Sequence, residues 1–198
     1  MWKKIASDEE RPQWNQVTYP HIPEDCPDID NDFNTENGGH LNCPNADHTY
    51  SGWKTHIRAD SPEHVTKIME ILHPLIAKHG LGCKFANPAM QEHIKGTNQD
   101  GKDITIYHPD IRDGKHLDQM NEIRNILADH GYPGHGDILG DTTIAPGIGV
   151  RREFDEEFMS RGQNAVGRDE YMSHYVHNPN VETHDEGLLQ DLDDRQNQ

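Results

Sequence analysis

Between about residues 51 and 178, hydrophobic and polar positions follow two alternating periods. Four segments have the two-residue period of a β-strand, in which successive side chains point to opposite faces of a sheet. These predicted strands cover residues 53–59, 82–86, 102–108 and 148–152. In the first of them, Lys54 and His56 fall on one face, whereas Trp53, Thr55 and Ile57 fall on the other.

Two further segments have the period of an amphipathic helix. The first begins at Ser61-Pro62-Glu63, where a serine can cap the helix and a proline suits its first turn, and it ends at Gly80. The second runs from Lys115 to His130. Residues 88–95 predict a helical turn, and the charged segment 153–175 predicts another helix.

The order of these elements predicts one α+β (or α/β) domain, with a central mixed sheet flanked by helices, over residues 51–178. The ends of the chain lack the periodicity. Residues 1–50 are crowded with Pro, Asn, Asp and Gly and predict an irregular N-terminal arm. Residues 179–198 are acidic and poor in aromatic residues, which predicts a disordered tail.

The charge balance narrows the classes of partner. The chain contains 35 Asp and Glu against 18 Lys and Arg, a formal net charge of −17. A net negative charge of this size repels the negatively charged backbone of a nucleic acid, so we expect no nucleic-acid partner. No apolar run approaches the ~18 residues of a membrane span, and no signal peptide opens the chain, so we also expect no membrane partner. Three widely spaced cysteines favour a reducing compartment.

Cationic residues at or beside the predicted strands are the first candidates for a site. They are Lys54, Lys84, Lys95, Lys102, Arg151 and Arg152. In so acidic a chain their positions indicate an anion site, although lysines also flank strands as charges that protect sheet edges. Lys54 would lie beside His56, and a bound phosphate would raise the pKa of that imidazole and make it a proton donor. A single histidine on a strand more often has a structural role.

Other chemistries lack their usual motifs. The 15 histidines suggest a metal site, but neither HExxH nor paired Cys/His spacing is present. His130 and His135 span a turn, where solvated loop histidines are the simpler explanation. Kinase motifs, a Walker A loop, a nucleophile elbow and a dinucleotide fingerprint are also missing. We therefore expect no metal and no cofactor.

Four short motifs resemble, in order, those of the phosphothreonine lyase family. GWKTHIRA at 52–59 is similar to the motif that opens the lyase domain of class III and IV lanthipeptide synthetases, and to a strand of the bacterial phosphothreonine lyase effectors. CKFA at 83–86 is similar to the strand with the family's second lysine. KDITIYHP at 102–109 and VRREFDEEFMSRG at 150–162 resemble the next two motifs. Arg58 replaces a family serine, and Lys95 is the positional counterpart of a family arginine.

This resemblance implies β-elimination of phosphate from phosphothreonine or phosphoserine in a protein or peptide, which leaves dehydrobutyrine or dehydroalanine. It implies that Lys84 is the base that takes the Cα proton and that His56 is the acid that protonates the leaving oxygen. The implied phosphate-binding residues are Lys54 and Arg151, with Lys102, Tyr107, Lys95 and Arg152 as further candidates.

Two other functions fit the same residues. A non-catalytic module could use the cationic site to bind a phosphorylated peptide. A structural or virion interaction protein would instead have its cations scattered over the surface. If the chain is a biosynthetic lyase, a separate kinase must phosphorylate its substrate in the cytoplasm. If it is an effector, it must be secreted into a host cell without a cleavable signal peptide.

Overall fold

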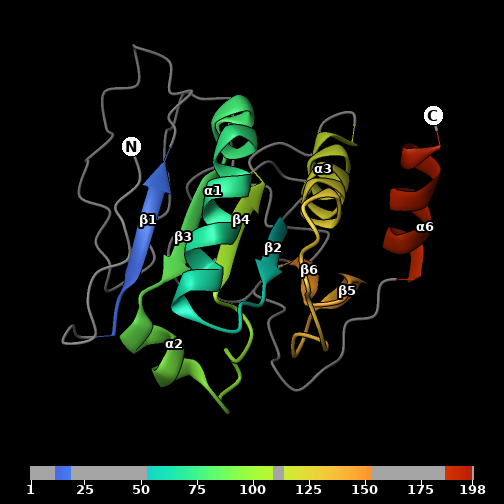
Figure 1. Ribbon diagram of the computed structural model, residues 1–198. Coiled ribbons are helices and arrows are strands. Elements are labelled where there is room, and N and C mark those ends of the chain that lie inside the picture. Colours follow the sequence, from blue (N-terminus) through green and yellow to red (C-terminus); the bar gives the residue numbers. More distant parts are fainter. Residues whose placement is uncertain (1–11, 19–52, 109–113, 153–185, 198) are drawn as a thin grey trace, which may run out of the picture.

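A six-stranded antiparallel sheet, in the order β1-β3-β4-β2-β6-β5, forms the centre of the protein (Figure 1). The computed structural model describes residues 12–18, 53–108, 114–152 and 186–197. The strands are β1 (Trp14–Thr18), β2 (Trp53–Ile57), β3 (Gly82–Ala86), β4 (Ile104–His108), β5 (Thr142–Ala145) and β6 (Ile148–Arg152). The helices are α1 (Pro62–His79), α2 (Pro88–Ile94), α3 (Lys115–Asp129) and α6 (Glu186–Gln196).

Helix α1 begins and ends where the sequence predicts. The Ser61 hydroxyl accepts a hydrogen bond from the His64 backbone N–H at 3.2 Å, and Pro62 occupies the first turn. Gly80 ends the helix with a φ of 63°, a left-handed conformation that glycine adopts at little cost. The capped helix presents a continuous apolar stripe to the sheet, through Val65, Ile68, Met69, Leu72, Leu75 and Ile76.

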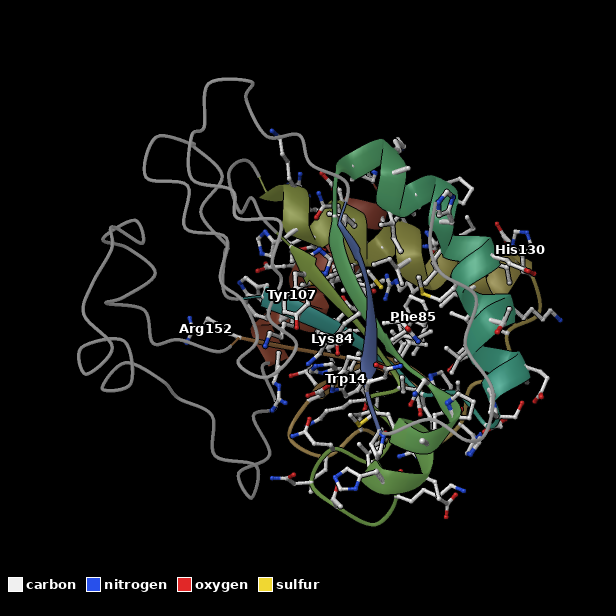
Figure 2. All side chains as sticks on the ribbon, turned by 90° about the vertical axis from the view of Figure 1, so that its left-hand side faces the viewer. Trp14, Lys84, Phe85, Tyr107, His130 and Arg152 are labelled. Carbon is white, nitrogen blue, oxygen red and sulfur yellow. The ribbon has the colours of Figure 1, made fainter. Side chains whose placement is uncertain are left out.

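The hydrophobic core lies between α1, α3 and one face of the sheet. Ile57, Phe85, Ile104 and Ile106 are fully buried on that face. Figure 2 shows Phe85 on the helix side of the sheet, with its chain neighbour Lys84 and with Tyr107 on the other side. Alternation along each strand therefore separates an apolar face from a polar one, and the polar face carries the predicted site.

The predicted α+β class and central sheet are confirmed, with two differences in the sheet. Every pairing that the structure describes is antiparallel, whereas a mixed sheet was expected. Residues 14–18 of the predicted irregular arm form the edge strand β1, and residues 142–145 form β5, which was not predicted. The rest of the arm and the predicted helix at 153–175 lie outside the described residues. None of the helices described is both long and apolar enough to cross a membrane.

The prediction of a disordered tail is wrong for residues 186–196, which form α6. Leu188 and Leu192, one helical turn apart, are buried, and the Leu192 carbonyl accepts a hydrogen bond from Asn121 Nδ2 at 2.8 Å. Arg195 donates to both carboxylate oxygens of Asp118, at 2.7 and 2.8 Å. Two leucines and one arginine thus attach an acidic segment to α3.

We expect Leu192→Ala to lower the free energy of unfolding by about 2–5 kcal/mol, because it leaves a cavity under α6. Leu189→Ala is the matched control, since Leu189 is 36% exposed on the same helix. It should cost less than about 1 kcal/mol. Urea denaturation monitored by circular dichroism measures both values. Equal losses in the two variants would show that α6 does not dock through Leu192.

A histidine in the core links β2 to α3. His108 Nε2 lies 2.8 Å from the Thr55 hydroxyl, and His108 Nδ1 lies 2.9 Å from Gln119 Oε1. Burial lowers the pKa of His108 to about 4, although the hydrogen bond with Gln119 favours the protonated form. The folded protein therefore holds this imidazole neutral, whereas the unfolded chain protonates it near pH 6.5.

Stability should consequently fall as the pH drops from about 6.5 towards 4, because the unfolded state binds the proton first. One such histidine contributes a slope of about 1.4 kcal/mol per pH unit in that window. We expect His108→Gln to flatten the slope by about this amount, and His93→Gln, which changes an exposed histidine, to leave it unchanged. Urea denaturation at a series of pH values provides the measurement, and an unaltered slope in His108→Gln would contradict it.

Candidate active site

The face of the sheet turned away from the helices brings predicted site residues into one row. Lys54 of β2 lies opposite Tyr107 of β4 on one side and opposite Arg151 of β6 on the other. Residues directly opposite each other in an antiparallel pair share a face of the sheet. The strand register therefore places an ammonium, a phenol and a guanidinium side by side across three strands.

A second row contains the predicted acid and base. His56 lies opposite Thr105 of β4, and Thr105 in turn lies opposite Lys84 of β3. His56 and Lys84 thus face the same side with one strand between them, which separates their backbones by ~10 Å. Side chains of their lengths can reach towards a group held between them.

Asp141 is a site residue that the sequence analysis did not identify. Its Oδ2 lies 2.7 Å from His56 Nδ1, and its Oδ1 lies 3.5 Å from Arg151 Nε. Gly149, opposite His56 on β6, makes room for it, because a Cβ there would lie 2.7 Å from the Asp141 Cβ. No local motif marks Asp141, and 85 residues separate it from His56.

The charges of this group follow from its burial. His56 is 3% exposed, and burial lowers its pKa to about 4, opposed by Asp141 and assisted by Arg151 and Lys102. Burial alone would raise the pKa of Asp141, but His56, Arg151 and Lys102 together hold it below its usual value. Since Asp141 is a carboxylate, His56 donates its Nδ1 proton to it, and the imidazole is neutral at neutral pH.

Two lysines of the site contact aromatic rings. Lys54 Nζ lies 5.0 Å from the centre of the Tyr107 ring, and Lys84 Nζ lies 4.5 Å from the centre of the Trp14 ring. Figure 2 shows Trp14, Lys84 and Tyr107 gathered along β1, β3 and β4. The face of an aromatic ring attracts a cation, so both contacts favour the ammonium form of the lysine. Trp14 was not predicted, because it lies in the aperiodic N-terminal segment.

Lys102 is the most deeply buried cation of the group. It is 1% exposed, and its Nζ donates to the Asn98 carbonyl at 2.9 Å. Burial, followed by the charge of Arg151, lowers the pKa of Lys102 to about 8. The charges of Lys54 and Lys84 also lower this pKa, so the protonation of Lys102 depends on the other cations of the site.

Three other cations lie apart from this cluster. Lys95 is exposed at the end of α2 and pairs with Glu92 at 2.6 Å. Arg152 lies opposite Trp53, so it faces the other side of the sheet from its chain neighbour Arg151. Figure 2 shows Arg152 away from Lys84. Arg58 donates to the Asp137 carbonyl at 3.1 Å and lies 3.6 Å from Asp100, so it connects two loops.

A cavity of about 660 Å³ lies beside Arg58, between α2 and the start of α1, and Lys95 also borders it. Its other charged residues are Asp60, Glu92, Asp100 and Asp103. It is thus distinct from the two rows on the sheet. Within the described ranges, no group of three or more His, Cys, Asp and Glu side chains is placed to hold a metal ion.

No protein-family model matches the chain, and no curated protein matches it either. The chemistry of the site must therefore be argued from its own geometry.

Removal of the Asp141 charge tests this arrangement. We expect His56 to remain neutral down to about pH 4 in the unmodified chain, and its pKa to fall further in Asp141→Asn, because Asp141 stabilises the imidazolium. Nitrogen chemical shifts of the imidazole, followed against pH by NMR, give both values. Asp137→Asn, which removes an exposed carboxylate, is the control. A His56 that titrates near 6.5 in both variants would contradict the buried pair.

Proposed function

We propose that the chain catalyses metal-independent β-elimination of phosphate from phosphothreonine or phosphoserine in a protein or peptide, giving dehydrobutyrine or dehydroalanine. The observation that carries the proposal is the gathering of cationic side chains around one imidazole, in a chain of net charge −17. Those cations are Lys54, Lys84, Lys102 and Arg151, and the imidazole is that of His56.

The phosphate would bind on the polar face of the sheet, over the paired strands β2 and β6. Lys54 and Arg151 lie opposite each other there, and Arg151 is 8% exposed. A guanidinium can donate two parallel hydrogen bonds to a phosphate, and a charged contact is stronger where little water competes. The dianion would also supply the negative charge that so many neighbouring cations favour. This pair therefore suits the group that leaves in the reaction.

His56 would act as the acid. With a pKa of about 4 the imidazole is neutral at neutral pH, but a phosphate dianion beside it would raise that pKa and allow it to carry a proton. Asp141 accepts from Nδ1, which fixes the ring and leaves Nε2 for the substrate. A proton placed on the bridging oxygen turns a poor leaving group into hydrogen phosphate.

Lys84 would act as the base, as the family resemblance implies. Its neutral amine takes the Cα proton, the electrons of the C–H bond form the Cα=Cβ double bond, and the Cβ–O bond breaks. The bridging oxygen takes the proton from His56. The separation of ~10 Å between the two backbones leaves room for one substrate residue between acid and base.

The runner-up is a module that binds phosphopeptide without converting it. The contact of Lys84 with Trp14 favours this alternative, because a protonated lysine binds phosphate but cannot accept a proton. Gathered cations are less expected of the third alternative, a structural or virion interaction protein. A lyase would act in the cytoplasm on the product of a separate kinase, or inside a host cell after secretion.

Mass spectrometry of phosphothreonine and phosphoserine peptides incubated with the protein tests the proposal. A lyase removes phosphoric acid, a loss of about 98 Da, whereas a phosphatase removes about 80 Da. We expect the larger loss. No change in mass with any of several phosphopeptides, together with measurable binding, would support the binding module and reject the lyase.

Variants of the acid and the base should separate catalysis from binding. We expect Lys84→Ala and His56→Asn each to slow elimination by roughly 10²–10⁴-fold, the usual range for a lost acid or base. The affinity for phosphopeptide should change much less, since Lys54 and Arg151 remain. Lys67→Ala, on the exposed side of α1, is the control and should behave as the unmodified chain. Unchanged rates in both site variants would remove these residues from the mechanism.

A further inference from the structure

Lys102 is buried, and no anionic side chain among the described residues is bonded to it. Its side chain is 1% exposed, and among the described residues its Nζ bonds to a neutral group, the Asn98 carbonyl. A charged amine in such a place loses its hydration without gaining a counter-ion, which disfavours the ammonium form. Lysines are almost never fully buried unless they are paired, so this position requires an explanation.

Cations on three strands of the site act on the charge of Lys102. Arg151 of β6, Lys54 of β2 and Lys84 of β3 all disfavour its positive charge. Asp141, which precedes β5, favours it, but that carboxylate already bonds His56 at 2.7 Å and lies 3.5 Å from Arg151. The described part of the site is therefore short of negative charge at Lys102.

We propose that Lys102 is a positioning residue that takes up a proton when a tetrahedral dianion binds beside Arg151. The dianion provides the missing counter-charge, and the ammonium that forms then helps to hold it. Above a pH of about 8 Lys102 is mostly neutral, and binding of the dianion would convert it to the ammonium form. This inference rests on the proposed function, because it concerns the same phosphate position.

The coupling between proton uptake by Lys102 and binding of a dianion favours one class of ligand. A phosphomonoester such as phosphothreonine carries close to two negative charges at neutral pH, whereas a phosphodiester carries one. A dianion stabilises the protonated Lys102 more than a monoanion does, so the site should prefer monoesters. Because the pKa of Lys102 is about 8, the proton uptake should be measurable above pH 8.

Calorimetric titration with sodium sulfate tests the proposal without turnover. Sulfate is a tetrahedral dianion that does not titrate between pH 7 and 9.5, so any proton uptake belongs to the protein. The titration is done at pH 8.5 in two buffers with different heats of ionisation. With a pKa of about 8, Lys102 is mostly neutral at this pH, and we expect an uptake of roughly 0.5–0.8 proton per sulfate bound.

Two variants assign the proton. Lys102→Arg keeps a positive charge at every pH and should bind sulfate with an uptake below ~0.2 proton. Lys102→Met should lose the uptake and bind sulfate at least ~10-fold more weakly. Lys67→Met on α1 is the control. The unmodified chain gives an independent readout, because its sulfate affinity should fall by up to ~10-fold per pH unit above pH 8.

The absence of sulfate binding, the absence of proton uptake, or an unchanged uptake in Lys102→Arg would each overturn the proposal. If Lys102→Arg does not fold by circular dichroism, Lys102→Met and the pH dependence of the unmodified chain decide instead. Failure of the proposed function is a separate result. Proton uptake without the loss of about 98 Da would support the anion site and reject the lyase. Elimination without proton uptake would support the lyase and reject the proposed role of Lys102.

Discussion

Strand β2 is hydrogen-bonded on both edges, to β4 and to β6, and the site depends on the register of these two pairings. The register puts Lys54 between Tyr107 and Arg151, and it puts His56 between Thr105 and Gly149. A shift by one residue would turn every β2 side chain to the opposite face. The core opposes such a shift, because Ile57 would leave it and Thr55 would lose its contact with His108. The packing on one face thus fixes the chemistry on the other.

The site itself opposes folding. Arg151, Lys102 and His56 are nearly inaccessible to solvent, and burial disfavours the charged forms of the last two. The lowered pKa values of His56 and Lys102 limit this cost, because they favour the neutral forms of both side chains. A bound phosphate would have the opposite effect, because its negative charge would favour a proton on both His56 and Lys102. The same electrostatic strain that lowers stability without a ligand therefore favours a dianion as the ligand.

The sequence predicted those parts of the fold and site that have a local signal. Alternation identified Lys54 and His56 on one face of β2, and the Ser61-Pro62 and Gly80 signals gave the ends of α1. Strand β1 and helix α6 were missed, because Trp14–Thr18 lies in an aperiodic segment and α6 buries only two leucines in an acidic one. Their stability comes from β3 and α3, which are distant in sequence.

The composition of the site shows the same division between local and distant signals. Residues on strands came from their spacing, whereas Asp141 could not, since its contact with His56 exists only after β5 and β6 pair. Lys95 was proposed from its position along the chain alone. It lies close along the chain to the expected position, but α2 directs it to solvent, where Glu92 pairs with it.

Two lysines of the site, Lys84 and Lys102, show how different surroundings favour different protonation states of the same type of side chain. Lys84 lies over the Trp14 ring, which favours its ammonium form. Lys102 is buried with a carbonyl as its partner, and the charge of Arg151 also disfavours its protonation, so its amine is favoured. Elimination needs a neutral Lys84, so the cations around it must outweigh the attraction of one indole ring. Binding alone has no such requirement. Under the proposed function, the balance between Trp14 and the neighbouring cations at Lys84 would therefore distinguish a lyase from a module that only binds phosphopeptide.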